Sequence, residues 1–305
     1  MTTIDRDAAA GPSGSASTVR GLLADPSLLV VDDRWYLYPT TDGSEGWAAD
    51  AFHAWSSPDL VTWREEGEVL RLGRDVDWAS DHAWAPAPFE RDGVFYLYFT
   101  AEQSIGVARS DSPTGPFVDL GRPLVARGDY PGTAIDPSVF ADDDGTVHLL
   151  WGNGVAHIVP LAPDLVSFDP AAVRSWTPAG FREAVSIHRH AGVCYATWSE
   201  NDTREADYRV RWAQAPHPTG PWTDGGVLLE KRPELGILGT GHHAVHRVPG
   251  TDDWIIAYHR FAIPSGNGHR REVVFDRLHH LPGGGLVPVV PSLDHLRLPL
   301  PARPR

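Results

Sequence analysis

The sequence predicts an all-β protein folded as a five-bladed β-propeller. Three observations lead to this prediction: a short phrase that occurs twice, a two-strand pattern that occurs five times, and the lack of a helical period. The phrase is Asp25-Pro26-Ser27 and again Asp136-Pro137-Ser138, and each copy opens an apolar run typical of an inner strand. Because a residue before proline is disfavoured in the helical region, we expect both aspartates in extended backbone at the start of a strand.

The repeated unit has a polar or acidic start, a short apolar strand, a turn containing Asp or Gly, and a second strand rich in aromatic residues. The expected strand pairs are residues 25–31 with 35–38, 83–89 with 94–99, 136–140 with 147–151, 183–187 with 193–198, and 243–246 with 254–259. The units start at positions 25, 83, 136, 183 and 242, which are 47–59 residues apart. Such a period is typical of propeller blades, which hold about four strands each around a central channel.

Outer hairpins repeat as well and support the same fold. The segments 52–60, 105–113 and 210–216 resemble one another, and the turns Pro113-Thr114-Gly115-Pro116 and Pro218-Thr219-Gly220-Pro221 have the same sequence. The chain has 305 residues, more than the ~100–200 of a common domain, but all-β architectures often form larger single domains. We expect a flexible segment over residues 1–20, rich in Ala, Gly and Ser, and one propeller domain over residues 21–305.

Composition excludes several classes of partner. Lys and Arg number 26 against 40 Asp and Glu, a formal net charge of −14 that argues against binding to nucleic acid or an anionic membrane. No apolar run approaches the ~18 residues of a membrane span, and residues 1–20 lack the pattern of a signal peptide, so we expect a cytoplasmic protein. The single cysteine, Cys194, is expected to be a buried small hydrophobic residue.

Acidic residues at the starts of repeated units indicate a chemistry. In a radial fold the equivalent ends of the inner strands meet at one axis, so Asp25 and Asp136 are expected to converge there. Paired carboxyl groups are what the hydrolysis of a glycosidic bond requires. The alternative is that these carboxylates only bind local backbone groups at the start of a strand.

The five unit starts together resemble those of glycoside hydrolase family 43. They are Ala24-Asp25-Pro26-Ser27, Ala83-Trp84-Ala85-Pro86, Ile135-Asp136-Pro137-Ser138, Arg182-Glu183-Ala184 and Gly241-His242-His243. The resemblance covers about residues 21–281. It implies a five-bladed propeller that hydrolyses arabinose- or xylose-containing saccharides with inversion. It also implies a general base at Asp25, a carboxylate that adjusts the acid's pKa at Asp136, and a general acid at Glu183.

One departure from the family pattern concerns the acid. Glu183 is followed by Ala184-Val185, whereas family members often have a proline two residues after the glutamate. The competing acids are Glu200 and Glu205, which we expect in a solvated hairpin loop.

The resemblance implies further site residues. His242 matches a histidine that faces the central channel, where it would contact substrate or, through water, a structural calcium or other cation; the chemistry itself requires no cofactor. The turn Asp142-Asp143-Asp144-Gly145 is more typical of a hairpin than of a calcium loop.

Arg271 is the best match to an arginine that reaches the substrate, with Arg270 and Arg277 as alternatives. Trp84 is expected at the pocket wall. Other tryptophans are expected in the core, namely Trp35, Trp151, Trp198 and Trp254.

The function that the sequence favours is an exo-acting α-L-arabinofuranosidase that removes pentose units from plant-type oligosaccharides. A β-xylosidase of the same family is the nearest alternative, and a propeller that binds carbohydrate or protein without catalysis is an alternative of another class. A fructose-cleaving enzyme is disfavoured, because Ala24-Asp25-Pro26 and Ile135-Asp136-Pro137 stand where such enzymes have Asn-Asp-Pro and Arg-Asp-Pro. The lack of a signal peptide and of an added sugar-binding module leads us to expect intracellular trimming of imported oligosaccharides.

Overall fold

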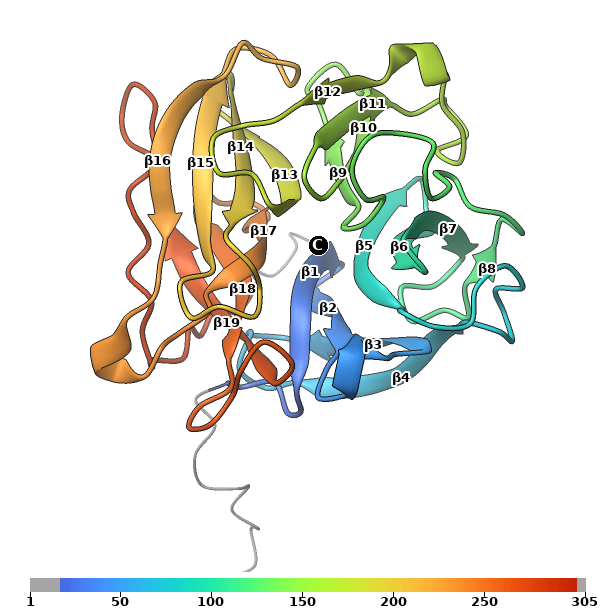
Figure 1. Cartoon of the computed structure of the whole chain (residues 1–305). Coiled ribbons are helices and arrows are strands. Elements are labelled where there is room, and N and C mark those ends of the chain that lie inside the picture. Colours follow the sequence, from blue (N-terminus) through green and yellow to red (C-terminus); the bar gives the residue numbers. More distant parts are fainter. Residues whose placement is uncertain (1–16, 301–305) are drawn as a thin grey trace, which may run out of the picture.

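The computed structural model describes residues 17–300 and shows five β-sheets arranged in a ring around a central channel (Figure 1). The predicted all-β, five-bladed propeller is thus confirmed. Regular helix within these residues is limited to three short 3-10 turns, η1 (Glu45–Trp47), η2 (Pro170–Ala172) and η3 (Pro233–Leu235). Consistent with this, no helix in the described part of the chain is long and apolar enough to cross a membrane.

Each blade is one antiparallel sheet whose strands follow one another in sequence order. Blade 1 contains β1 (Leu23–Val31), β2 (Arg34–Thr41), β3 (Ala51–Ser57) and β4 (Arg64–Arg71). Blade 2 contains β5 (Trp84–Arg91), β6 (Val94–Ala101), β7 (Ser104–Ser110) and β8 (Val118–Asp119). Blade 3 contains β9 (Ser138–Ala141), β10 (Val147–Trp151), β11 (Ala156–Pro160) and β12 (Arg174–Trp176). Blade 4 contains β13 (Glu183–His190), β14 (Val193–Glu200), β15 (Arg209–Ala215) and β16 (Thr223–Leu229), and blade 5 contains β17 (Gly241–Arg247), β18 (Trp254–Phe261) and β19 (Arg271–Leu278).

The first strand of every blade lines the central channel, as the sequence predicts. These are β1, β5, β9, β13 and β17, which together surround a cavity of about 280 Å³. The expected count of about four strands per blade is met in four blades, whereas blade 5 has three strands in the described chain. Beyond β19 the chain leaves that sheet, and Val289 forms a parallel bridge with Leu229 of β16.

Apolar side chains fill the spaces between neighbouring blades. Five buried clusters are present, one at each interface of the ring. The predicted core tryptophans lie in these clusters with at most 8% of their surface exposed: Trp35, Trp151, Trp198 and Trp254. Cys194 is fully buried in the cluster between blades 3 and 4, as expected.

The two ends of the described chain meet at the interface of blades 5 and 1. Val19 is 2% exposed and Leu298 is 8% exposed, and both belong to the apolar cluster that joins these blades. Ser17 Oγ also donates a hydrogen bond of 2.6 Å to the carbonyl of Val273 in β19. The packed domain therefore begins before the expected boundary at residue 21, while residues 1–16 and 301–305 lie outside the described residues.

The starts of the inner strands are not extended, which corrects one prediction. Asp25 has a φ of 49° and Asp136 a φ of 58°, both in the left-handed region. The proline rule excludes the right-handed helical region but leaves the left-handed one open, and a β-bulge uses it here. The pairing of β1 with β2 slips between Ala24 and Ser27, so the bulge brings Asp25 out of the regular strand alternation.

Candidate active site

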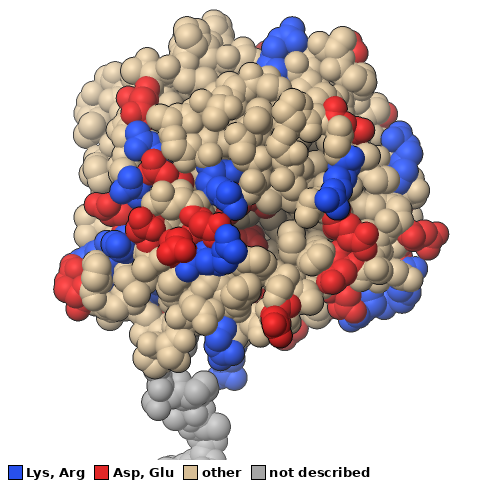
Figure 2. All heavy atoms as spheres, in the orientation of Figure 1, with Lys and Arg blue, Asp and Glu red and all other residues tan. Residues whose placement is uncertain are grey.

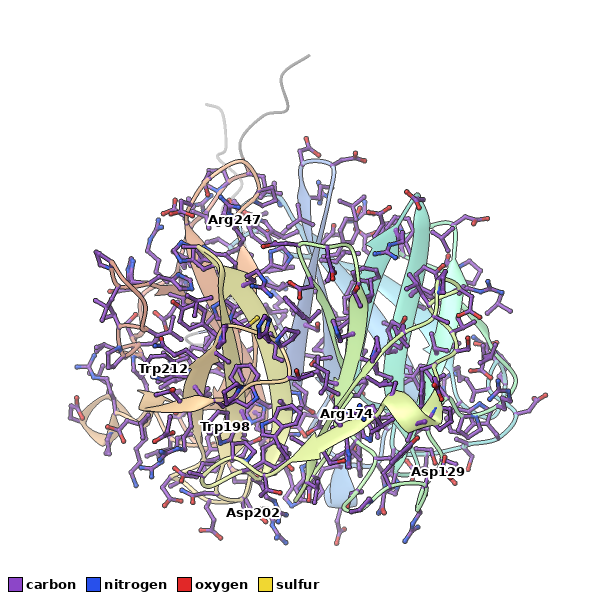
Figure 3. The ribbon with its side chains drawn as sticks, turned by 90° about the horizontal axis from the view of Figure 1, so that it is seen from above. Asp129, Arg174, Trp198, Asp202, Trp212 and Arg247 are labelled. Atoms are coloured by element: carbon purple, nitrogen blue, oxygen red, sulfur yellow. The ribbon has the colours of Figure 1, made fainter. Side chains whose placement is uncertain are left out.

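A pocket of about 230 Å³ opens at the axis of the propeller. It is lined by residues from the starts of the inner strands and from loops of blades 1, 4 and 5, namely Asp25, Trp47, Trp84, Ile135, Asp136, Arg182, Glu183, Asp202, Thr203, Arg204, His242 and Arg271. Figure 2 shows this face, where acidic and basic side chains gather around a central hollow. In the view of Figure 3, Asp202 lies at one end of the blades and Arg247 at the opposite end.

The structure brings together all six predicted site residues: Asp25, Trp84, Asp136, Glu183, His242 and Arg271. The three carboxyl-bearing residues Asp25, Asp136 and Glu183 are buried, with 6–8% of their surface exposed.

One left-handed residue marks the start of each blade. These residues are Asp25, Ala85, Asp136, Ala184 and His242, with φ between 38° and 58°. In four blades a slip in the pairing of the first two strands accompanies this residue. Asp25 and Asp136 are therefore structural equivalents, as predicted.

Glu183 is not the equivalent of the two aspartates. The left-handed residue of blade 4 is Ala184, and Glu183 comes one residue before it. The assumed alignment of Glu183 with Asp25 is thus wrong by one position. Because Glu183 precedes the bulge, it pairs in register with Ser199 of β14.

Each left-handed backbone N–H is directed to a neighbouring blade. Four of these N–H groups donate to a side chain at the end of the preceding blade's second strand: Ala85 to Thr40, Asp136 to Thr100, His242 to Ser199, and Asp25 to His259, at 2.8–3.2 Å. Gly152 holds the corresponding position before blade 4, and it has no side chain that could accept. There the Ala184 N–H donates a hydrogen bond to the Asp136 carboxyl group instead.

Asp25 has one oxygen that faces a guanidinium group and two imidazole rings. Its Oδ1 lies 3.3 Å from Nη1 of Arg271, 3.3 Å from Nδ1 of His242 and 3.1 Å from Nδ1 of His259. Burial alone would raise the pKa of Asp25, but Arg271 and the two histidines outweigh burial and hold this pKa well below its ordinary value. Asp25 is therefore ionised at neutral pH.

Arg271 is fixed by a second carboxylate. Its Nε and its backbone N–H each donate to Oδ2 of Asp42 at 2.9 Å, and its Nη1 lies 3.3 Å from Thr203 Oγ1. The Asp42 side chain is only 1% exposed. This ion pair orients the guanidinium toward Asp25 and the pocket.

Asp136 lies in the opposite electrostatic environment. Burial raises its pKa well above the ordinary value, and the charges of Glu183 and then Asp25 add to this rise. Within residues 17–300, its Oδ2 has no hydrogen-bond partner and lies 3.7 Å from Nδ1 of His242. The charge of Glu183 thus acts on the pKa of Asp136, while the role of Asp136 in adjusting the acid stays a prediction.

Glu183 has a donor on each oxygen. Tyr208 O–H donates to Oε1 at 2.8 Å, and Asn153 Nδ2 donates to Oε2 at 2.7 Å. Arg182 Nε lies 3.9 Å from Oε2, and the same arginine is bound to Asp202 at 3.2 Å. The carboxyl group is held in one orientation beside the pocket.

His242 connects the carboxyl groups rather than standing apart from them. Its ring contacts Asp25 and Asp136, and its backbone N–H binds Ser199. Burial lowers the pKa of His242, so the ring is neutral at pH 7. His243 points elsewhere and is buried with its pKa lowered to about 3, again mainly by burial.

Two tryptophans line the pocket beside the carboxyl groups. Trp84, the predicted wall residue, donates from Nε1 to the carbonyl of Trp47 at 2.7 Å. Trp47 in turn donates to the carbonyl of Gly268 at 2.8 Å, and its ring packs against His269. Indole faces held in this way are suited to stacking on a sugar ring.

Neither alternative acid lines the pocket. Glu200 ends β14 and binds Nε of Arg209 at 2.5 Å, so it lies in an ion pair rather than in a solvated loop. Glu205 is exposed in the turn after Asp202. The arginine alternatives, Arg270 and Arg277, also lie outside the pocket.

Several residues of the site are missed by the sequence motifs. Asp42, Asn153, Ser199, Tyr208 and His259 all bind a carboxyl group, the arginine or His242. One signal could have found two of them: Ser199 and His259 lie near the end of the second strand of a blade, which is where each blade contacts the next.

The predicted cation finds no direct ligand set. Among residues 17–300, no group of three or more His, Cys, Asp or Glu side chains is arranged to hold a metal ion. The Nδ1 atom of His242 is directed at the Asp25 and Asp136 carboxyl groups, so it does not fit a direct metal ligand. A cation held through water in the channel stays a prediction.

Three buried carboxyl groups, one clamped arginine and two tryptophans around a small axial pocket define a glycoside hydrolase. The model of the family "Glycosyl hydrolases family 43" matches residues 16–284, and the chain belongs to this family. The resemblance noted from the sequence is therefore confirmed.

Several known proteins are similar to this chain over most of their length. A β-D-galactofuranosidase of Aspergillus niger is 31% identical, over 90% of this chain and 84% of that protein. Xylosidase/arabinosidase 43A of Humicola insolens is 30% identical, over 88% of this chain and 97% of that protein. The solved structure of an α-L-arabinofuranosidase from Clostridium thermocellum superposes with a TM-score of 0.74 at 30% identity, over 89% of this chain and 94% of that one.

Proposed function

We propose that this glycoside hydrolase is an exo-acting α-L-arabinofuranosidase that inverts the anomeric configuration. The observation that carries the proposal is the pocket itself, in which Asp25, Asp136 and Glu183 share a volume of about 230 Å³. This volume is smaller than the roughly 300–1,000 Å³ of pockets for drug-sized ligands, which favours a single terminal sugar over a polymer chain.

Asp25 acts as the general base in this proposal. A base must be ionised to take a proton from water, and the low pKa of Asp25 meets this condition at neutral pH. The activated water attacks the anomeric carbon from the side of Asp25, and the glycosidic bond breaks on the opposite side.

Glu183 acts as the general acid, and Asp136 supports it. The charges of the two groups are coupled, since the charge of Glu183 adds to the rise that burial causes in the pKa of Asp136. Glu183 delivers a proton to the leaving oxygen, because it lies at the pocket wall beside Arg182.

The names of the relatives support the choice of substrate. The matched Clostridium structure is an α-L-arabinofuranosidase, and the Humicola relative acts as xylosidase and arabinosidase. The Aspergillus relative is a β-D-galactofuranosidase, and β-D-galactofuranose has the same ring configuration as α-L-arabinofuranose. A furanose-shaped pocket accounts for both names, whereas a β-xylosidase is the second candidate because of the Humicola enzyme.

A panel of substrates tests the proposal. The protein is incubated with aryl α-L-arabinofuranosides, β-D-xylosides and β-D-galactofuranosides, and with linear arabino-oligosaccharides. We expect the highest kcat/KM on arabinofuranosides, release of single arabinose units, and an inverted product by proton NMR. Higher activity on xylosides would show that the protein is a β-xylosidase. A product with retained anomeric configuration would exclude Asp25 as a base that acts through water. If no glycoside is cleaved, a non-catalytic binding protein is favoured.

A further inference from the structure

We propose that Ser199 and Tyr208 form a hydrogen-bond relay from the His242 backbone to Glu183, which directs the catalytic proton of Glu183 to Oε2. The inference rests on the proposed role of Glu183 as the acid. It makes Ser199 and Tyr208 positioning residues, since neither lines the pocket in which the sugar would bind.

The relay consists of three contacts in the interior. The His242 N–H donates to Ser199 Oγ at 2.9 Å. The Ser199 hydroxyl hydrogen-bonds the phenol oxygen of Tyr208, and the Tyr208 O–H donates to Glu183 Oε1 at 2.8 Å. Both Ser199 and Tyr208 have 0% of their surface exposed, so water does not compete with these contacts.

The direction of every hydrogen bond in the relay is set at its first member. A backbone N–H can only donate, so Ser199 Oγ accepts from His242 and its own proton is left for Tyr208. The phenol then directs its single proton to Glu183. Burial raises the pKa of Tyr208 well above its ordinary value, with a further rise from the charge of Glu183, so the phenol keeps this proton.

The two oxygens of Glu183 become unequal as a result. Oε1 receives a hydrogen bond from Tyr208 at 2.8 Å, and Oε2 receives one from Asn153 Nδ2 at 2.7 Å. The phenol directs its single proton to Oε1, whereas the Asn153 amide can turn its oxygen toward a protonated Oε2, so the proton of the neutral carboxyl group belongs on Oε2. Oε2 lies on the side of Arg182, which lines the pocket. The relay thus presents the proton toward the position of the leaving oxygen.

Packing holds the tyrosine in place. The Tyr208 ring stacks on His259, with ring centroids 5.6 Å apart and planes inclined by 13°. On another side it contacts Gly241, where a Cβ atom would lie 2.2 Å from the ring. His259 also binds Asp25, so the relay and the proposed base share one support.

Two other blades have a hydroxyl residue at the position of Ser199, but without the onward link to a carboxyl group. Thr40 and Thr100 occupy the position equivalent to Ser199 and bind the N–H of the next blade in the same way. Ser199 alone among these hydroxyl residues is linked onward to a carboxyl group through a tyrosine. Threonine is therefore a conservative replacement for Ser199 that the fold already uses elsewhere.

The test combines Tyr208→Phe with the matched pair Ser199→Val and Ser199→Thr. Valine has the shape of threonine but lacks the hydroxyl group. We expect Tyr208→Phe to lower kcat/KM about 10–100-fold on arabinosides with poor leaving groups, and less than about threefold on dinitrophenyl arabinosides, which need no acid. Ser199→Val follows in the same direction with a smaller loss, and Ser199→Thr stays near wild type.

Titration distinguishes this role from a structural one. Loss of the donor disfavours the ionised carboxylate, so the alkaline limb of the pH–rate profile moves to higher pH in Tyr208→Phe and Ser199→Val. The Glu183 carboxyl carbon, identified in carbon-13 NMR spectra by its absence from Glu183→Gln, shifts its titration midpoint in the same direction. This second readout needs no turnover.

The control is Tyr98→Phe, since Tyr98 is a fully buried tyrosine of blade 2 that donates to the carbonyl of Leu165 at 2.5 Å. It should leave both readouts unchanged. Equal losses on both leaving groups in Tyr208→Phe, with an unmoved Glu183 titration, would overturn the relay. If the wild type cleaves no glycoside but the Glu183 titration still shifts, the relay stands and only the proposed function fails.

Discussion

Asp25 and Asp136 occupy equivalent positions of two blades, yet their surroundings move their pKa values in opposite directions. Arg271 and two histidines lower the pKa of Asp25, whereas burial and the neighbouring Glu183 raise that of Asp136. Identical Asp-Pro-Ser phrases thus hold carboxyl groups with different pKa values. The backbone conformation is the same in both, but the charges of the residues that face the two carboxyl groups differ.

The role of Glu183 predicts a dependence on the leaving group. Glu183→Gln keeps the size of the side chain but removes the transferable proton. We expect kcat/KM on arabino-oligosaccharides to fall by about 10²–10⁴-fold, and activity on dinitrophenyl arabinosides to stay within about tenfold of wild type. Steady-state kinetics with both substrates check this.

Glu200→Gln is the control for that measurement, because Glu200 pairs with Arg209 outside the pocket. Its leaving-group dependence should equal that of the wild type. Near-normal hydrolysis of oligosaccharides by Glu183→Gln would exclude Glu183 as the acid.

We expect the buried Asp136 carboxyl group to lower the stability of the fold at neutral pH, although the proposed catalysis requires it. Because folding raises the pKa of Asp136, the folded state disfavours its ionised form, and this penalty appears as the pH rises through the folded-state value. Asp136→Asn is therefore expected to be more stable than wild type at neutral pH by about 1–3 kcal/mol, with the difference vanishing toward pH ~4, and to be nearly inactive. Urea unfolding across pH 4–8 measures this.

Asp276→Asn is the matched control in β19, away from the pocket. The pKa of Asp276 is raised to about 6, chiefly by burial, so the wild type loses stability as the pH rises through about 6. The Asp276→Asn variant does not titrate there, so it should become more stable than the wild type over this range while keeping full activity. An Asp136→Asn variant that is less stable than wild type at pH 7 would show that the Asp136 charge is compensated.

At the level of the strand, the left-handed residue at the start of each blade decides which side chain reaches the axis. A slip of one residue in pairing reverses the faces of a strand, so the position of the bulge sets the site. In blades 1 and 3 the left-handed residue itself carries the carboxyl group, whereas in blade 4 the residue before it does. His242 fills the left-handed position in blade 5.

Strand β17 offers a test of how closely this arrangement is packed. An alanine at Gly241 would place its Cβ 2.2 Å from the Tyr208 ring and displace the tyrosine from Glu183. We expect Gly241→Ala to lower kcat/KM on poor leaving groups at least about tenfold, and to destabilise the fold by about 1–3 kcal/mol. Kinetics with both leaving groups and thermal unfolding provide the measurement.

Gly225→Ala serves as the comparison, because a Cβ there would lie 2.2 Å from Trp212 in the outer part of blade 4. It should lose similar stability without a change in leaving-group dependence. Equal kinetic behaviour of the two variants would mean that Gly241 acts through general stability alone.

For the molecule as a whole, the ring is closed by residues from both ends of the described chain rather than by a strand shared between blades. The Leu298 N–H donates to Asp59 at 2.9 Å, and the Leu298 carbonyl accepts from Trp35 Nε1 at 3.2 Å. Val19 packs into the same cluster. Blades 5 and 1 are therefore joined by the termini of the described chain.

Leu298→Ala tests this closure. Removing a buried leucine leaves a cavity at the joint, so we expect a loss of about 2–4 kcal/mol in the free energy of unfolding and an unchanged kcat/KM at 25 °C. Leu293→Ala, at a site that is 40% exposed, should change stability by less than about 0.5 kcal/mol. A stable Leu298→Ala variant would show that the joint does not depend on this contact.

Much of the architecture was predictable because it depends on patterns among residues that are close in the sequence. Alternating apolar residues and turn signals recur once per blade, so the number of blades and the inner strands could be predicted from neighbouring residues alone. The three-stranded form of blade 5 could not, because it depends on where the chain after β19 packs.

The sequence by itself determined the propeller, its inner strands and the six residues Asp25, Trp84, Asp136, Glu183, His242 and Arg271 that gather at the axis. Only the tertiary structure decided the one-residue offset of Glu183 and the partners that hold these groups. Asp42 lies 229 residues from Arg271, and His259 lies 234 residues from Asp25. Such contacts leave no periodic signal, because the closure of the ring, rather than local backbone preference, brings them together.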